Sequence, residues 1–233
     1  MNDTIRQHPF TTVAEAGEES RARFIVRTYV HLLGAMLLFV VTEYVLFATG
    51  AAVTITNFVI GINWLLILGA FMLVGWLASR TAHSSASRPM QYLALIAFVL
   101  AEALIFVPLL YIAEVSVGGG VIASAAIVTL VGFLALTAVV YVTRKDFSFL
   151  GAVLKWVGIA ALLLIGAGVL FGFELGTFFS VGMVVFAGAA ILYDTSNILH
   201  HYPEDRYVGA SLELFASVAL MFWYVLQLFM ARD

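Results

Sequence analysis

The sequence predicts an all-α membrane protein, a bundle of seven transmembrane helices. Of its 233 residues, 63% are hydrophobic and only 11% are charged, and the mean hydropathy is +1.06. Such a composition is typical of a polytopic membrane protein and not of a soluble domain. The apolar residues form seven long runs, each able to cross roughly 30 Å of hydrocarbon as a helix. These runs cover about 24–49, 63–79, 91–113, 121–142, 151–171, 176–199 and 207–230.

The basic residues predict the orientation of these spans. If the amino terminus is cytosolic, ten of the eleven Lys and Arg residues lie on the cytosolic side and only Arg232 lies outside. This bias predicts a cytosolic amino terminus and an external carboxyl terminus. Residues 1–23 are polar and lack the apolar core of a cleavable signal peptide, so we expect a cytosolic, partly disordered tail ahead of a transmembrane domain at 24–233.

Several classes of function are excluded or disfavoured by residues that the chain lacks. It has no cysteine, which rules out disulfides, thiolate metal sites and cysteine nucleophiles. The net charge of −3 disfavours nucleic-acid binding, which usually requires an excess of basic residues. Neither a His-Glu-x-x-His run nor a Gly-x-Ser-x-Gly elbow occurs. We therefore expect no catalytic residue, no cofactor and no enzyme activity.

One acidic residue stands out in the sixth apolar run, which reaches Asp194 before its hydrocarbon ends. A charged aspartate within a membrane helix costs about 2.5–3.5 kcal/mol, so it usually faces a partner or water. Small residues share its helical stripe, which predicts a face packed against other helices. In the alternative interpretation, Asp194 already lies among the headgroups at a frayed helix end. The stripe comprises Gly176, Ser180, Met183, Ala187, Ala190, Asp194, Asn197 and His201.

A second stripe, along the seventh run, carries Glu213 and Ser217 one helical turn apart. The predicted topology places Asp194, Glu213 and Arg80 at one depth near the inner leaflet. We therefore predict a buried cluster of these three residues, with Ser217 and Asn197 donating hydrogen bonds. Such a cluster would titrate as a coupled unit, and Asp194 and Glu213 would offer oxygens to a transient calcium ion. The alternative is three unrelated interfacial charges. We predict no permanent metal site.

Two further acids, Glu43 and Glu102, lie in the outer third and near the middle of their spans. With the inner cluster they would mark a polar path across the bundle. Alternatively, each is a separate hydrogen-bonding group between helices. Pro108 follows Glu102 and is expected to kink its helix.

Three stretches resemble the Bax inhibitor-1 (TMBIM) family. They are Tyr141-Val-Thr-Arg-Lys-Asp-Phe-Ser-Phe-Leu-Gly151, Ile191-Leu-Tyr-Asp-Thr-Ser-Asn-Ile-Leu-His200, and the seventh span with its ending Ala231-Arg-Asp233. Within the family the chain looks most similar to the bacterial YccA-like branch, which modulates the FtsH membrane protease. The resemblance implies six helices around the last one and a place in the bacterial cytoplasmic membrane.

For better-understood bacterial members, the resemblance also implies a pH-sensitive calcium leak. That leak is gated by two aspartates on helices six and seven, paired with an arginine from helix two. The first aspartate falls on Asp194 and the arginine on Arg80, whereas the second aspartate falls on Ser217. The chain thus departs from the di-aspartyl pattern, and Glu213 is our own candidate for the missing carboxylate.

Two functions of different classes follow as expectations. In the first, the protein is a proton-sensitive calcium or cation leak in the lipid bilayer, gated by Asp194, Arg80 and Glu213. In the second, it is a regulatory protein that engages an FtsH-type membrane-anchored AAA protease through its tail.

Overall fold

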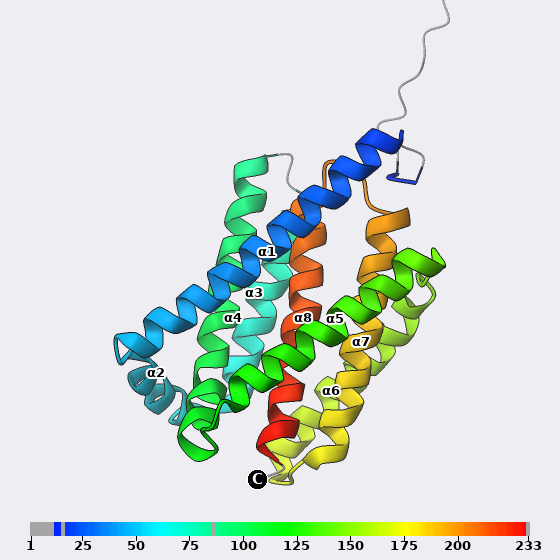
Figure 1. The fold of residues 1–233 in the computed structure, drawn as a ribbon. Helices are drawn as coiled ribbons and strands as arrows, with labels where there is room; N and C mark the ends of the chain where they lie inside the picture. Colours follow the sequence, from blue (N-terminus) through cyan, green and yellow to red (C-terminus); the bar gives the residue numbers. More distant parts are fainter. Residues whose placement is uncertain (1–11, 15–16, 85–86, 232–233) are drawn as a thin grey trace, which may run out of the picture.

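The predicted fold class is confirmed by a computed structural model of the chain, which describes residues 12–14, 17–84 and 87–231 (Figure 1). Seven of the helices formed by the described residues are long and apolar enough to cross a membrane. The first of these helices begins at one end of the bundle and the last ends at the opposite end. The helices are α1 (Glu18–Ala48), α2 (Ala51–Ile60), α3 (Trp64–Ser84), α4 (Arg88–Ser116), α5 (Val121–Thr143), α6 (Leu150–Phe171), α7 (Gly176–His200) and α8 (Tyr207–Met230).

The first part of the chain differs from the prediction in two places. The helix α1 begins at Glu18, six residues before the start expected for the first span. The short helix α2 occupies a stretch that we expected to be a connection; its 10 residues rise only about 15 Å and do not span a bilayer. Gly50, with φ of 76°, makes the turn between α1 and α2 in a conformation that favours glycine. Most of the predicted tail, and Arg232, lie outside the described residues.

The last helix, α8, is the centre of the bundle. It contacts α1, α3, α4, α5 and α7, and its buried residues continue through all of its turns. The aromatic ring of Phe106 on α4 anchors this core: it stacks on Phe222 at 5.6 Å and meets Trp223 edge-on at 4.9 Å. The helix α6 packs on α7 and α3. Of the helices that the family resemblance places around the last one, α6 is therefore separated from α8, and a cavity lies between the two.

A short segment of the predicted tail is fixed on the bundle. The backbone N–H of Val13 donates to the carbonyl oxygen of Tyr202 at 3.0 Å, and Thr12 forms a β-bridge with Pro203. The Val13 side chain is fully buried and belongs to the hydrophobic core. Residues 12–14 thus lie against the turn between α7 and α8, at the end of the bundle where α1 begins.

Candidate functional site

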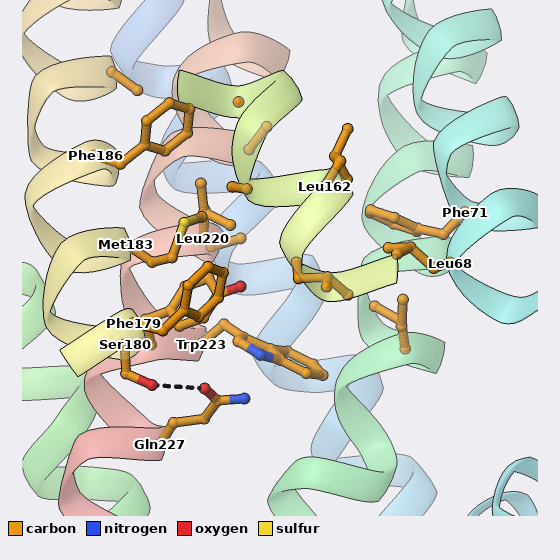
Figure 2. A pocket seen from close by; sticks show the side chains of 18 of the residues that line it. Leu68, Phe71, Leu162, Phe179, Ser180, Met183, Phe186, Leu220, Trp223 and Gln227 are labelled. Carbon is orange, nitrogen blue, oxygen red and sulfur yellow. Dashed lines mark hydrogen bonds between the residues drawn. The ribbon is translucent and has the colours of Figure 1, made fainter. Parts of the chain in front are cut away.

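The candidate site is a cavity of about 800 Å³ between α3, α4, α6, α7 and α8 (Figure 2). Most of its wall is apolar, with Leu68 and Phe71 on one side and Met183, Leu220 and Trp223 on the other. Its polar groups include Asp194, Glu213, Ser180 and Gln227. The Ser180 hydroxyl donates a hydrogen bond of 3.1 Å to Gln227 Oε1. The cavity therefore extends along most of the length of α8.

Two stripes of the sequence face each other across this cavity. From α7 it is lined by Gly176, Ser180, Met183, Ala190 and Asp194, and from α8 by Glu213, Ala216, Ser217, Leu220, Tyr224 and Gln227. The structure thus places Asp194 on a helix–helix face, well inside α7, and not at a frayed end.

The carboxyl group of Asp194 is held by the neighbouring helix. The Ser217 hydroxyl donates a hydrogen bond of 2.5 Å to Asp194 Oδ2, and both side chains are buried. A short bond of this kind to a carboxylate belongs to the stronger class of hydrogen bonds, and it satisfies an acid that would otherwise be costly to bury. The predicted donor role of Ser217 is therefore present in the geometry.

Glu213 has partners on α3 that the sequence analysis missed. The Ser79 hydroxyl donates to Glu213 Oε1 at 2.5 Å, and His83 Nδ1 lies 3.8 Å from the same oxygen. His83 Nδ1 carries a proton, because it donates to the Ser79 carbonyl oxygen at 2.8 Å. Its Nε2 lies 3.3 Å from the hydroxyl of Tyr202. Burial raises the pKa of Tyr202, so this hydroxyl keeps its proton at neutral pH.

A glycine on α8 makes room for the His83 ring. A Cβ atom at Gly209 would lie 3.1 Å from two atoms of that ring. The sequence did hold a signal for this contact, since Ser79 and His83 are four residues apart on α3 and Gly209 precedes Glu213 by four residues on α8.

Arg80 is not brought to the carboxylates, which corrects the predicted three-residue cluster. Its guanidinium lies over the ring of Trp76, 5.2 Å from the ring centre, and the side chain is exposed. Adjacent residues point about 100° apart on a helix, so when Ser79 faces α8 its neighbour Arg80 turns away. Asn197 also fails to donate: within the described part of the chain its side chain has no hydrogen-bond partner, and only its backbone carbonyl accepts, from His201 and Tyr202.

Glu43 and Glu102 are equally buried, each with 7% of its surface exposed, yet they lie in different surroundings. Glu102 lines the cavity, whereas Glu43 on α1 is not among the residues of its wall. Both carboxyl oxygens of Glu43 are enclosed and lack a partner among the described residues. Glu102, Asp194 and Glu213 therefore line the same cavity, and Glu43 does not.

Comparison with known proteins gives the family. Residues 21–233 match the family model described as inhibitor of apoptosis-promoting Bax1. The chain belongs to the Bax inhibitor-1 family. This match covers all seven spanning helices nearly from end to end.

Individual relatives of this chain include proteins of bacteria, viruses and eukaryotes. The chain is 38% identical over 115 residues to the uncharacterized protein PA2604 of Pseudomonas aeruginosa, covering 48% of this chain and 50% of that protein. It is 30% identical over 224 residues to the Golgi anti-apoptotic protein of vaccinia virus, strain Lister, covering 94% and 89% of the two chains. It is 34% identical over 118 residues to the modulator of FtsH protease YccA of Escherichia coli K12, covering 49% and 53%. Two of these matches thus span about half of the relative's length.

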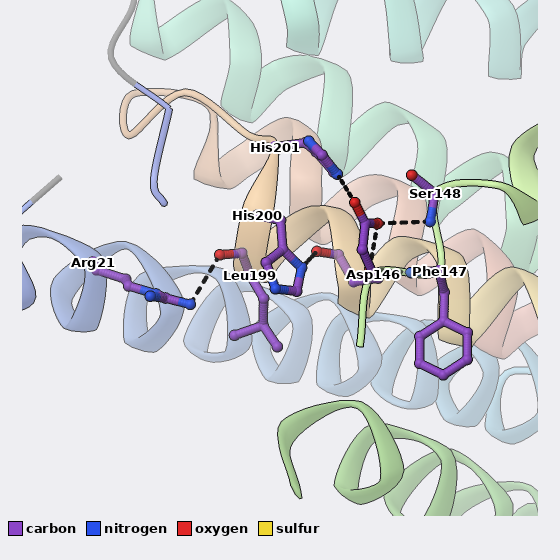
Figure 3. Close-up of polar contacts among 8 residues, drawn as sticks. Arg21, Asp146, Phe147, Ser148, Leu199, His200 and His201 are labelled. Carbon is purple, nitrogen blue, oxygen red and sulfur yellow. Dashed lines mark hydrogen bonds and ion pairs between the residues drawn. The ribbon is translucent and has the colours of Figure 1, made fainter. Parts of the chain in front are cut away.

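The loop between α5 and α6 adds a second polar network to this Bax inhibitor-1 fold (Figure 3). Asp146 Oδ1 accepts from the backbone N–H of Ser148 at 2.8 Å and from the Ser196 hydroxyl at 3.3 Å, while Oδ2 accepts from His201 Nε2 at 3.0 Å. Ser196 in turn accepts from the backbone N–H of Phe147 at 2.8 Å. The network ties the loop to the end of α7, only a few residues from Asp194.

This network is expected to weaken in acid. The pKa of Asp146 falls from an ordinary 3.8 to about 2, chiefly through the backbone hydrogen bond from Ser148 and further through His201. Because the folded pKa is the lower one, the stabilisation is present above about pH 4 and is lost as the pH falls toward 2. The carboxylate is half-exposed, so screening should limit the loss to about 0.5 kcal/mol.

The change to make is Asp146→Asn, measured by thermal unfolding of purified protein in detergent between pH 2.5 and pH 6. The variant should be less stable than the wild type at pH 6, and the difference should shrink as the pH falls toward the lower limit. Asp205→Asn, at a carboxylate 62% exposed in the turn between α7 and α8, is the matched control and should leave the profile unchanged. A constant offset between Asp146→Asn and the wild type at every pH would contradict the assignment.

Proposed function

We propose that this protein is a proton-sensitive cation leak whose gate contains Asp194, Ser217 and Glu213. The observation that supports this best is the position of two carboxylates on neighbouring helices, both lining one cavity that runs along α8. Carboxylate oxygens are among the ligands that calcium prefers in proteins. We further propose that the end of the bundle carrying Glu18, Arg21 and Arg23 faces the cytosol and that the membrane is the bacterial cytoplasmic one.

The contacts of the two acids suggest how such a gate closes. Each carboxylate is engaged by a serine from another helix, Asp194 by Ser217 and Glu213 by Ser79. These bonds hold α8 to α7 and to α3 at levels one helical turn apart. Transfer of a proton to or from the carboxylates changes the charge presented to a cation and the strength of both bonds. Closure then depends on hydroxyl bonds and on His83, not on a salt bridge to Arg80.

Calcium flux into proteoliposomes between pH 6 and pH 8 tests this proposal. The wild-type protein should give a flux that changes with pH, and Asp194→Asn should abolish that change because the side chain no longer titrates. Glu43→Gln is the matched control, since Glu43 is buried but lies outside the cavity wall. A flux no larger than that of empty liposomes at every pH would rule out the leak.

A second candidate is a regulator that binds a membrane-anchored AAA protease. It is favoured by the similarity to the modulator of FtsH protease YccA. We propose that residues 1–11 are the segment that such a protease engages; they precede Thr12 and Val13, which are held against the bundle. Co-purification with FtsH should be lost when residues 1–11 are deleted and retained in Asp194→Asn. Equal recovery of FtsH with and without residues 1–11 would contradict this role for the segment.

A further inference from the structure

The ionisable side chains in the wall of the cavity are all acids. Four acidic residues line its wall, Glu102, Glu174, Asp194 and Glu213, and none of its lining residues within the described chain is Lys, Arg or His. Two of the acids already have serine partners. Glu102 does not: no side chain in the described ranges makes a hydrogen bond or ion pair with it, although only 7% of its surface is exposed. A carboxylate in this position is stabilised by a cation that enters the cavity.

The rest of the wall fits an organic cation better than a hydrated metal ion. Aromatic rings from four helices line the cavity: Phe71, Phe98, Phe106, Phe179, Trp223 and Tyr224. The faces of such rings attract cations, most strongly where water is excluded. The volume of about 800 Å³ lies in the range of pockets that enclose ligands of drug size. An inorganic ion would leave most of this apolar space unfilled.

Access from the hydrocarbon phase suits the same class of ligand. The wall includes Leu68 and Phe71 from α3 and Leu162 from α6 (Figure 2), and other faces of these two helices expose large apolar side chains such as Leu66, Trp76 and Leu163. A ligand that partitions into the bilayer is therefore concentrated next to the two helices that form the outer wall.

From these observations we propose that the cavity is a binding site for a lipophilic organic cation, with Glu102 as its counter-ion and the rings of Phe106 and Trp223 against its apolar body. The site does not depend on the cation leak proposed above: it requires neither conduction nor a gate. It uses Glu102, which is not part of the proposed gate of Asp194, Ser217 and Glu213.

Equilibrium dialysis of the purified full chain against tetraphenylphosphonium tests the site. The wild type should bind about one ion per chain saturably, and Glu102→Gln should weaken the affinity at least tenfold. Glu43→Gln is the matched control, because Glu43 is as buried as Glu102 and lies outside the cavity; it should bind like the wild type. Tetraphenylborate, an anion of the same shape, should show no saturable binding when it is dialysed alone.

Several results would overturn the proposal. They are the absence of saturable binding to the wild type, equal weakening by Glu102→Gln and Glu43→Gln, and saturable binding of tetraphenylborate dialysed alone with an affinity equal to that of the cation. If Glu102→Gln lowers the unfolding temperature, Trp223→Leu is the second variant to test. Binding of tetraphenylphosphonium by Trp223→Leu with wild-type affinity would also contradict the proposed site. Calcium conduction without binding of tetraphenylphosphonium would exclude this site and leave the proposed leak unaffected. Binding of tetraphenylphosphonium without calcium conduction would support the site and exclude the leak.

Discussion

Phe106→Ala is expected to lower the free energy of unfolding by about 3 kcal/mol. The ring is 2% exposed and contacts three other aromatic side chains: Phe39 at 5.1 Å, Phe222 at 5.6 Å and Trp223 at 4.9 Å between ring centres. Lipid tails are as apolar as a protein core, so the loss is one of packing contacts and cavity formation, not of transfer from water. Reversible unfolding in mixed detergent micelles measures it.

The control for this substitution is Phe178→Ala on α7. That ring is 94% exposed on the outer surface of the bundle, so its removal should cost less than about 0.5 kcal/mol. Similar losses for the two variants would show that α4 does not pack on α8 through Phe106 as described.

Ser217→Ala is expected to destabilise the fold by about 2 kcal/mol, since it leaves the buried carboxyl of Asp194 without its donor. The 2.5 Å bond between these residues joins α7 to α8, and both side chains are 8% exposed. A double-mutant cycle with Asp194→Asn, measured by the same unfolding assay, should give a coupling energy of about 1 kcal/mol or more.

Ser211→Ala is the matched control on the same helix. Ser211 is fully buried, but its hydroxyl bonds only to carbonyl oxygens of its own helix, those of Tyr207 and Val208. Its removal leaves no side chain of another helix unpaired, so the loss should stay below about 1 kcal/mol. Equal effects of Ser211→Ala and Ser217→Ala would mean that the bond to Asp194 contributes nothing specific.

The last four helices were predictable to within one residue at either end, because each is an apolar run bounded by polar or glycine-rich turns. The short helix α2 was not, since its 10 residues are too few for hydropathy to separate a helix from a connection. Val13 was missed for a similar reason: one apolar residue in a polar tail gives no periodic signal.

The site was predictable in its carboxylates and less so in their partners. Periodicity along α7 and α8 placed Asp194, Ser217 and Glu213 on facing stripes, and the structure brings all three to one cavity. The partner on α3 depends on the rotation of that helix about its own axis, which a run of mostly apolar residues does not encode. A rotation that turns Ser79 and His83 inward turns Arg80 outward, and only the packed bundle determines it.

Tyr202 connects the segment that precedes α1 with the polar groups beside the cavity. Its carbonyl oxygen holds the backbone of Val13, while its hydroxyl reaches the imidazole of His83, next to Glu213. A single residue therefore contacts both the segment that precedes α1 and the polar groups beside the cavity. A pull on residues 12–14 would therefore act on the turn that carries Tyr202, and through its hydroxyl on His83.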